Sequence, residues 1–109
     1  MAAKEFEQVL RYWPEDVETN FMLGLCYKEL MEPARAIPLF EKVLRRNPRH
    51  TQALYYLGAS YLQIGNASLG KAYLRRYDHL ARQEESLATP RAAQRAARAR
   101  DMRAVGSSS

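Results

Sequence analysis

Apolar residues recur at intervals of three and four along most of the chain, the spacing that gathers them on the faces of α-helices. Residues 17–30 carry two such stripes, one with Phe21, Leu25 and Lys28 and another with Leu23, Cys26, Tyr27 and Leu30. Two stripes are expected of a helix that packs on two sides. The pattern predicts an all-α protein with helices at about 2–12, 17–30, 33–46, 51–64 and 67–83, and a further helix at 90–104.

Glycine, asparagine and proline mark the predicted helix ends. Gly65 can adopt the left-handed conformation that ends a helix, and the Asn66 side chain can accept an N–H from the first turn of the next helix. Pro33 suits a first helical position, where its missing N–H is no loss. Pro38 falls beyond the first turn of the same helix, so we expect a local bend there.

The sequence repeats itself at a shift of 34 residues. Leu23 aligns with Leu57, Gly24 with Gly58, Tyr27 with Tyr61 and Pro14 with Pro48. A constant period of this length is typical of a solenoid, in which each unit buries its apolar face only by stacking on the next.

The repeat resembles the tetratricopeptide repeat, a 34-residue pair of antiparallel helices. The matching positions are Leu23, Gly24, Tyr27, Ala36, Phe40 and Pro48 in one unit and Leu57, Gly58 and Tyr61 in the next. The resemblance covers residues 2–84, as a half repeat at 2–14 and full repeats at 17–50 and 51–84. It implies an antiparallel helix-hairpin α-solenoid of about two and a half repeats with a C-terminal capping helix at 88–104.

Some positions depart from the family pattern. Asn20 and Leu54 stand where the family has tryptophan, Gly70 replaces an alanine, and Arg82 replaces the proline that would end the second unit. Gly70 should cost its helix about 1 kcal/mol relative to alanine. The missing proline allows the last helix to run on. Gly24 and Gly58 are expected to let the two helices of each hairpin approach closely.

The resemblance also implies a concave groove that is lined by the first helix of each repeat. The residues carried over to it are Phe21, Leu25, Lys28, Tyr55, Ala59 and Leu62. This aromatic and aliphatic set differs from the lysine, asparagine and arginine with which some family members bind a C-terminal carboxylate. We expect the groove to bind a peptide or amphipathic helix of a partner protein. Packing of Phe21 and Tyr55 within the stack is the alternative interpretation.

Charge is concentrated at the C-terminus. Of the formal net charge of +5, residues 1–85 contribute +1 and residues 86–109 contribute +4. Arg91, Arg95 and Arg98 share one helical face, opposite a face of alanines. We expect a helix that caps the last hairpin, followed by a disordered tail at 105–109. A basic adaptor that contacts phosphates of nucleic acid through these arginines is the functional alternative, and disorder of the segment is a third.

Candidate chemistry is sparse. One cysteine, Cys26, excludes an intrachain disulfide, and Cys26, His50 and His79 lack the spacing of a zinc site. No phosphate-binding loop or catalytic motif occurs, so we expect neither an enzyme nor a cofactor. The apolar runs are too short for a bilayer span. We expect a soluble cytoplasmic protein, and an open face at Phe6 and Leu10 makes a homodimer a subsidiary hypothesis.

Overall fold

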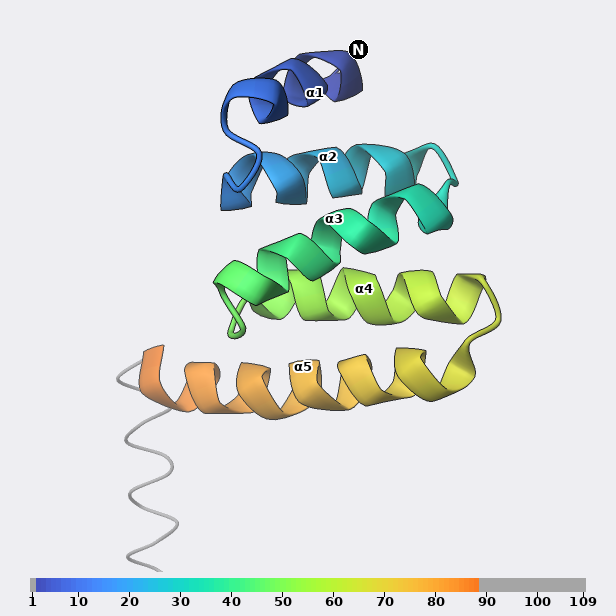
Figure 1. Ribbon diagram of the computed structural model, residues 1–109. Coiled ribbons are helices and arrows are strands. Elements are labelled where there is room, and N and C mark those ends of the chain that lie inside the picture. The colour runs from blue at the N-terminus through green and yellow to red at the C-terminus, as the bar shows by residue number, and fades with distance from the viewer. Residues whose placement is uncertain (1, 89–109) are drawn as a thin grey trace, which may run out of the picture. The chain divides into compact units, whose positions relative to one another are not determined.

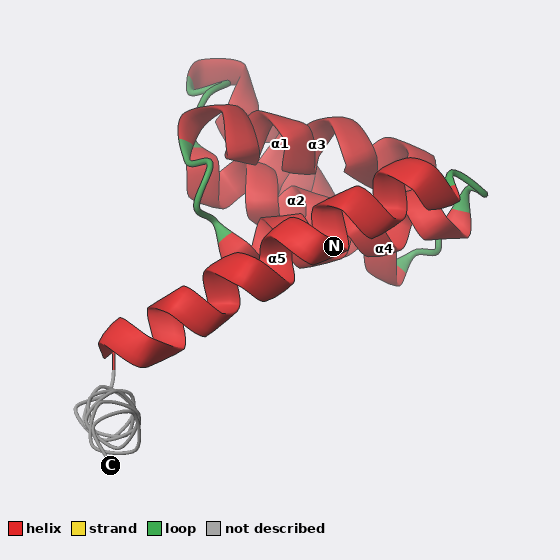
Figure 2. Cartoon of the chain, turned by 90° about the horizontal axis from the view of Figure 1, so that it is seen from below, coloured by secondary structure: helices red, strands yellow, loops and turns green. Residues whose placement is uncertain are grey.

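The computed structural model describes residues 2–88 of the 109-residue chain, with side chains described over residues 3–84. These residues form five α-helices, α1 (Ala2–Tyr12), α2 (Val17–Glu29), α3 (Pro33–Arg46), α4 (Thr51–Gln63) and α5 (Ala67–Ala88). From α1 to α4, each helix packs against the next one in the chain (Figure 1). Only helices and loops occur within residues 2–88 (Figure 2), which confirms the all-α prediction.

The helix bounds follow the prediction closely through α4. α5 differs, because it continues past the predicted end at residue 83 to Ala88. Arg82 stands where a proline would have interrupted the backbone hydrogen bonds, so the longer helix has a direct chemical reason. The predicted capping helix, the tail at 105–109, and Arg91, Arg95 and Arg98 lie outside the described residues. The repeat boundaries at 2–14, 17–50 and 51–84 stay predictions.

The two prolines of α3 have different positions in the helix. Pro33 occupies the first turn, as predicted. Pro38 lies in the interior, and α3 continues through it to Arg46. Pro38 and Ala34 are both exposed, so water can reach the Ala34 carbonyl, for which Pro38 offers no N–H. The bend expected at Pro38 stays a prediction.

The hairpin turns from α2 to α3 and from α4 to α5 share one hydrogen-bond pattern. In each turn, an N–H two residues beyond the end of the helix donates to a carbonyl in the last helical turn, at 2.8 Å after α2 and 2.9 Å after α4. Each bond closes over a left-handed residue, Met31 with φ of 62° and Gly65 with φ of 88°. The conformation predicted for Gly65 is confirmed. At Met31 the same turn forms without glycine, at a cost of about 1–2 kcal/mol.

Side chains cap the N-termini of α2, α4 and α5. Asp16 accepts the Thr19 hydroxyl at 2.6 Å and the Thr19 N–H at 2.9 Å, and these two hydrogen bonds lower the pKa of the Asp16 carboxyl. His50 Nδ1 and Asn66 Oδ1 each accept a backbone N–H at 3.1 Å. The caps satisfy amide groups that would otherwise lack a partner within the helix.

The conserved spacing of Gly24 and Gly58 within the two repeats reflects close contact between helices. A Cβ atom placed on Gly24 would lie 2.6 Å from Phe40 Cε1, and one on Gly58 would lie 2.8 Å from Leu74 Cγ. Phe40 is fully buried and cannot move aside. The close approach predicted at both glycines is confirmed.

Gly70 also has a packing role, which corrects the expectation that it only weakens its helix. A Cβ atom there would lie 2.7 Å from Leu62 Cδ2 and 3.0 Å from the carbonyl oxygen of Gly58. Gly58 and Gly70 thus face each other where α4 crosses α5. An alanine at position 70 would gain helix propensity but would meet backbone that has little freedom to shift.

Asn20 fills the place that a tryptophan takes in the family pattern. Its side chain is fully buried, and Nδ2 donates to the Pro14 carbonyl at 3.0 Å and to the Asp16 carbonyl at 2.8 Å. These bonds hold the turn between α1 and α2 against the start of α2. The substitution therefore exchanges apolar bulk for hydrogen bonds to the turn.

The chain divides into two compact units after Tyr77, within α5. The first unit contains α1 to α4, the start of α5, and a core centred on Phe40, Val43, Leu54 and Leu57. In the second unit, Arg82 pairs with Asp78 at 2.8 Å. All surfaces described below belong to the first unit.

Candidate partner-binding surface

A row of aromatic rings begins at Phe21 in α2. The Phe21 ring centroid lies 4.7 Å from that of His50 and 6.0 Å from that of Tyr56 in α4. Tyr56 also stacks on Phe40 of the core at 5.9 Å. Phe21 is only 9% exposed, so most of its ring is covered by this packing.

Tyr55 extends the row to the surface. Its ring centroid lies 5.4 Å from that of Tyr56 and 5.3 Å from that of Tyr77 in α5. Tyr55 is nevertheless 45% exposed. We call Phe21, His50, Tyr55, Tyr56 and Tyr77 the aromatic strip. Its rings support one another, and Tyr55 presents the largest described exposure among those that the exposed hydrophobic residues include.

Two shallow depressions border the aromatic strip. One, of about 510 Å³, is lined by Val17, Glu18, Phe21, Met22, His50 and Gln52. The other, of about 250 Å³, is lined by Gln52, Tyr55, Tyr56 and Tyr77. Because Gln52 borders both, the two depressions adjoin. Their combined lining is apolar and aromatic with a few polar edges, which suits side chains of a bound protein segment.

Charged groups at the edge of the strip are few. The Lys28 ammonium lies 5.1 Å from the centre of the Tyr56 ring, a cation–π contact that fixes the end of a long side chain. Glu18 lines the larger depression. The strip is therefore set up for apolar contact, with one cation and one carboxylate available for polar contacts.

The residues predicted for the groove have unequal exposure. Tyr55 and Leu62 are exposed, Leu25, Lys28 and Ala59 are half-buried, and Phe21 is nearly buried. The structure connects Phe21 to Tyr55 through Tyr56. Leu62 packs instead against Gly70 in the crossing of α4 and α5. The role of this set in binding stays a prediction.

Sequence reasoning missed Tyr56 and Tyr77, and it treated His50 only as a surface or packing histidine. Tyr77 lies one repeat after the buried Val43, and this register was the available signal that it faces the same side of its hairpin. Tyr56 has no such signal, because its repeat partner Met22 is exposed. His50 serves both as the cap of α4 and as a ring in the strip.

Other chemistry is limited in the part of the chain that the structure describes. No group of three or more histidine, cysteine or acidic side chains there could hold a metal ion. Cys26 is a free, half-buried thiol. Among helices α1 to α5, none combines the length and the apolar character that crossing a bilayer demands. Phe6 and Leu10, considered above for self-association, are half-buried on α1.

A family model described as tetratricopeptide repeat matches residues 27–85, which is more than half of the chain. The chain belongs to the tetratricopeptide repeat family. No curated protein gives a significant match. The matched range runs from the end of α2 to α5 and includes the two hairpin turns and the Gly58–Gly70 crossing. Tetratricopeptide repeat domains generally mediate interactions between proteins.

Proposed function

We propose that this chain is a non-enzymatic protein-interaction module that binds a peptide or amphipathic helix of a partner protein on the aromatic strip. The observation that carries the proposal is the exposure of Tyr55 between two supporting rings. A core residue would be covered, and an isolated surface tyrosine would be free to rotate. Tyr55 is held in place and open to a partner.

Energetics favour this use of Tyr55. A tyrosine that is already fixed by its neighbours loses little conformational entropy when a partner covers it. A fully desolvated aromatic side chain at the centre of an interface contributes about 2 kcal/mol or more to binding. The adjoining depressions on either side of Gln52 provide room for two apolar side chains of the bound segment.

The charge at the strip favours an apolar segment over a polyanion. Lys28 is the cation at the strip, and it already lies over the Tyr56 ring. Glu18 opposes an anionic ligand in the larger depression. Binding by apolar contact depends weakly on salt, whereas binding through phosphates weakens steeply as salt rises.

The proposal is tested by selecting peptides from a random displayed library against the full chain. The selected peptides should carry apolar residues at helical or alternating spacing, and their affinity should change by less than about threefold between low and physiological salt. Nuclear magnetic resonance titration should place the perturbed amides around Gln52, Tyr55 and Tyr77. Perturbations confined to other parts of α1 to α5, or a steep loss of affinity with salt, would contradict the proposal.

A further inference from the structure

Charge within the first unit is divided along the chain. Residues 1–32 contain three lysines and arginines against seven acidic residues, a net charge of −4. Residues 33–77 contain eight lysines and arginines against Glu41 alone, a net charge of +7. The near-neutral total of residues 1–85 conceals this division. The positive charges belong mainly to α3 and α5, the second helices of the two hairpins.

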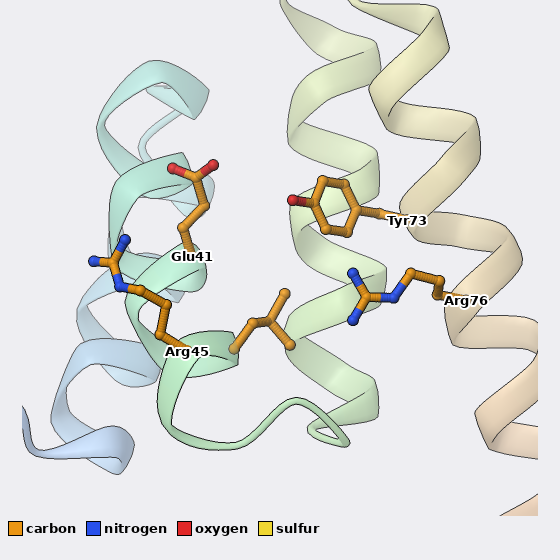
Figure 3. A pocket seen from close by; sticks show the side chains of 5 residues that line it. Glu41, Arg45, Tyr73 and Arg76 are labelled. Atoms are coloured by element: carbon orange, nitrogen blue, oxygen red, sulfur yellow. The ribbon is translucent and has the colours of Figure 1, made fainter.

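A hollow of about 310 Å³ lies between these two helices. It is lined by Glu41, Leu44, Arg45, Tyr73 and Arg76, which we call the basic hollow. Figure 3 shows Glu41 and Arg45 on α3, facing Tyr73 and Arg76 on α5. The tyrosine hydroxyl and the Arg76 guanidinium both point toward α3 (Figure 3). The basic hollow has no residue in common with the aromatic strip.

Glu41 is occupied by a partner outside the hollow. Its Oε2 accepts a hydrogen bond from the Tyr61 hydroxyl at 2.8 Å. Arg45 is one helical turn further along α3, where an ion pair with Glu41 would be common, but no such pair forms. Neither Arg45 nor Arg76 has an ion-pair partner among the described residues. Two exposed guanidinium groups therefore border the hollow without a carboxylate to neutralise them.

The α5 wall of the hollow is rigidly arranged. The Tyr73 ring stacks on Tyr61 with centroids 5.7 Å apart and an angle of 3° between the planes. The Arg76 guanidinium carbon lies 5.6 Å from the Tyr73 centroid. Stacking limits the rotation of Tyr73, and the cation–π contact keeps Arg76 close to it. An anion entering the hollow meets donors that are already positioned.

We propose that the basic hollow binds an acidic segment of a partner protein, with an Asp or Glu carboxylate between Arg45 and Arg76. The guanidinium groups donate hydrogen bonds to the carboxylate, the Tyr73 hydroxyl provides a further donor, and Leu44 contacts aliphatic carbon of the segment. The site is distinct from the aromatic strip, so a partner can engage both surfaces or either one.

The lining favours an acidic peptide over nucleic acid. The hollow has the size of one or two side chains, and Glu41 would repel the consecutive phosphates of a nucleic acid strand. Tyr73 is its single ring and is already stacked on Tyr61, whereas single-stranded nucleic acid binds on rings that are free to stack with bases.

The test uses an acetylated and amidated peptide of alternating glutamate and alanine, titrated into the full isotope-labelled chain. The amide resonances around Glu41–Arg45 and Tyr73–Arg76 should shift. Arg45→Glu or Arg76→Glu should weaken binding about tenfold, because each reverses a charge at the carboxylate. Lys4→Glu on α1 makes the same change in net charge away from the hollow, and it should weaken binding less than about twofold.

Four results would overturn the proposal. The first is equal binding of the peptide with glutamine in place of glutamate, and the second is an equal loss of affinity in Lys4→Glu. The third is a set of shifted amides confined to residues 91–103 or to the aromatic strip. The fourth is tighter binding of a single-stranded oligonucleotide of equal charge that is lost in Arg45→Glu, which would assign the hollow to nucleic acid.

Discussion

The Tyr61 hydroxyl donates a hydrogen bond to Glu41, and the Tyr27 hydroxyl donates one to Glu7, 34 residues earlier in both partners. Each bond joins the first helix of a hairpin to the last helix of the unit before it, α4 to α3 and α2 to α1. The tyrosine of the repeat pattern therefore links successive units as well as filling the layer beside the glycine.

This link makes stability depend on pH in the alkaline range. Burial and the hydrogen bond to Glu41 raise the pKa of Tyr61 from 10.0 to about 12, and the hydrogen bond to Glu7 raises the pKa of Tyr27. The folded protein therefore favours the protonated phenols. Their contribution to stability is complete below pH 10 and is lost as the pH rises through 12. Chemical denaturation at a series of pH values should show unfolding free energy falling above pH 10.

Tyr61→Phe provides the matched variant for this effect. It should lower the free energy of unfolding by about 1 kcal/mol at neutral pH, because the hydrogen bond to Glu41 is lost. The alkaline fall should also become shallower. Tyr12→Phe, at a tyrosine that is 77% exposed, should leave both quantities unchanged. An alkaline fall of the same steepness in Tyr61→Phe would mean that another group causes it.

Met31 is a site where a single substitution should stabilise the protein. Met31→Gly relieves a left-handed backbone strain of about 1–2 kcal/mol, and the greater freedom of glycine in the unfolded chain offsets about 0.4–1 kcal/mol. We expect a net gain of about 0.5–1 kcal/mol in the free energy of unfolding, measured by urea denaturation. Met31 is 73% exposed, so little packing is lost.

The equivalent turn supplies the reverse experiment. Gly65→Met introduces the same strain at a site where a Cβ atom would have no neighbour within 4 Å. It should destabilise the protein by a similar amount. Destabilisation by Met31→Gly, together with a neutral Gly65→Met, would show that backbone conformation does not control these turns.

The glycines inside the helices should respond unequally to alanine. Gly24→Ala should cost about 1–3 kcal/mol, since its Cβ would meet the fully buried Phe40. Gly70→Ala should cost less, because Leu62 is 41% exposed and can move, and because alanine gains about 1 kcal/mol of helix propensity. Thermal unfolding of the two variants measures the difference. A larger loss at Gly70 would indicate that the Gly58 carbonyl, not Phe40, sets the tighter limit.

The repeat period made much of this fold predictable. Gly24, Gly58 and Gly65 have roles that follow from what a side chain or a negative φ would prevent, so their identity carries structural information. The same period did not reveal that Met31 takes the position of Gly65, because methionine has no preference for that conformation.

The aromatic strip could be predicted only in part. Tyr55 was placed correctly on the surface because the register of the first helix fixes its direction. The burial of Phe21 was not accessible, since it depends on rings from α3 and α4 that converge on it only in three dimensions. The basic hollow was missed for a related reason: the charges of α3 and α5 cancel those of α1 and α2 when they are counted along the chain.

The burial of Phe21 changes how its substitution should behave. Phe21→Ala should cost about 3–5 kcal/mol of stability, as expected for a buried aromatic residue. Its effect on binding would then reflect the loss of folded protein. Tyr55 is the residue of the strip at which binding and folding can be separated.

The most direct test of the account compares Tyr55→Ala with Tyr12→Ala in calorimetric titration of a selected peptide, alongside thermal unfolding of both variants. Each removes an exposed tyrosine, but Tyr12 stands at the end of α1, outside the aromatic strip. We expect Tyr55→Ala to weaken binding about tenfold or more with a nearly unchanged melting temperature, and Tyr12→Ala to change neither. Equal effects of the two variants on affinity, or a loss of affinity in Tyr55→Ala that only parallels a loss of stability, would contradict the assignment of the aromatic strip as the partner-binding surface.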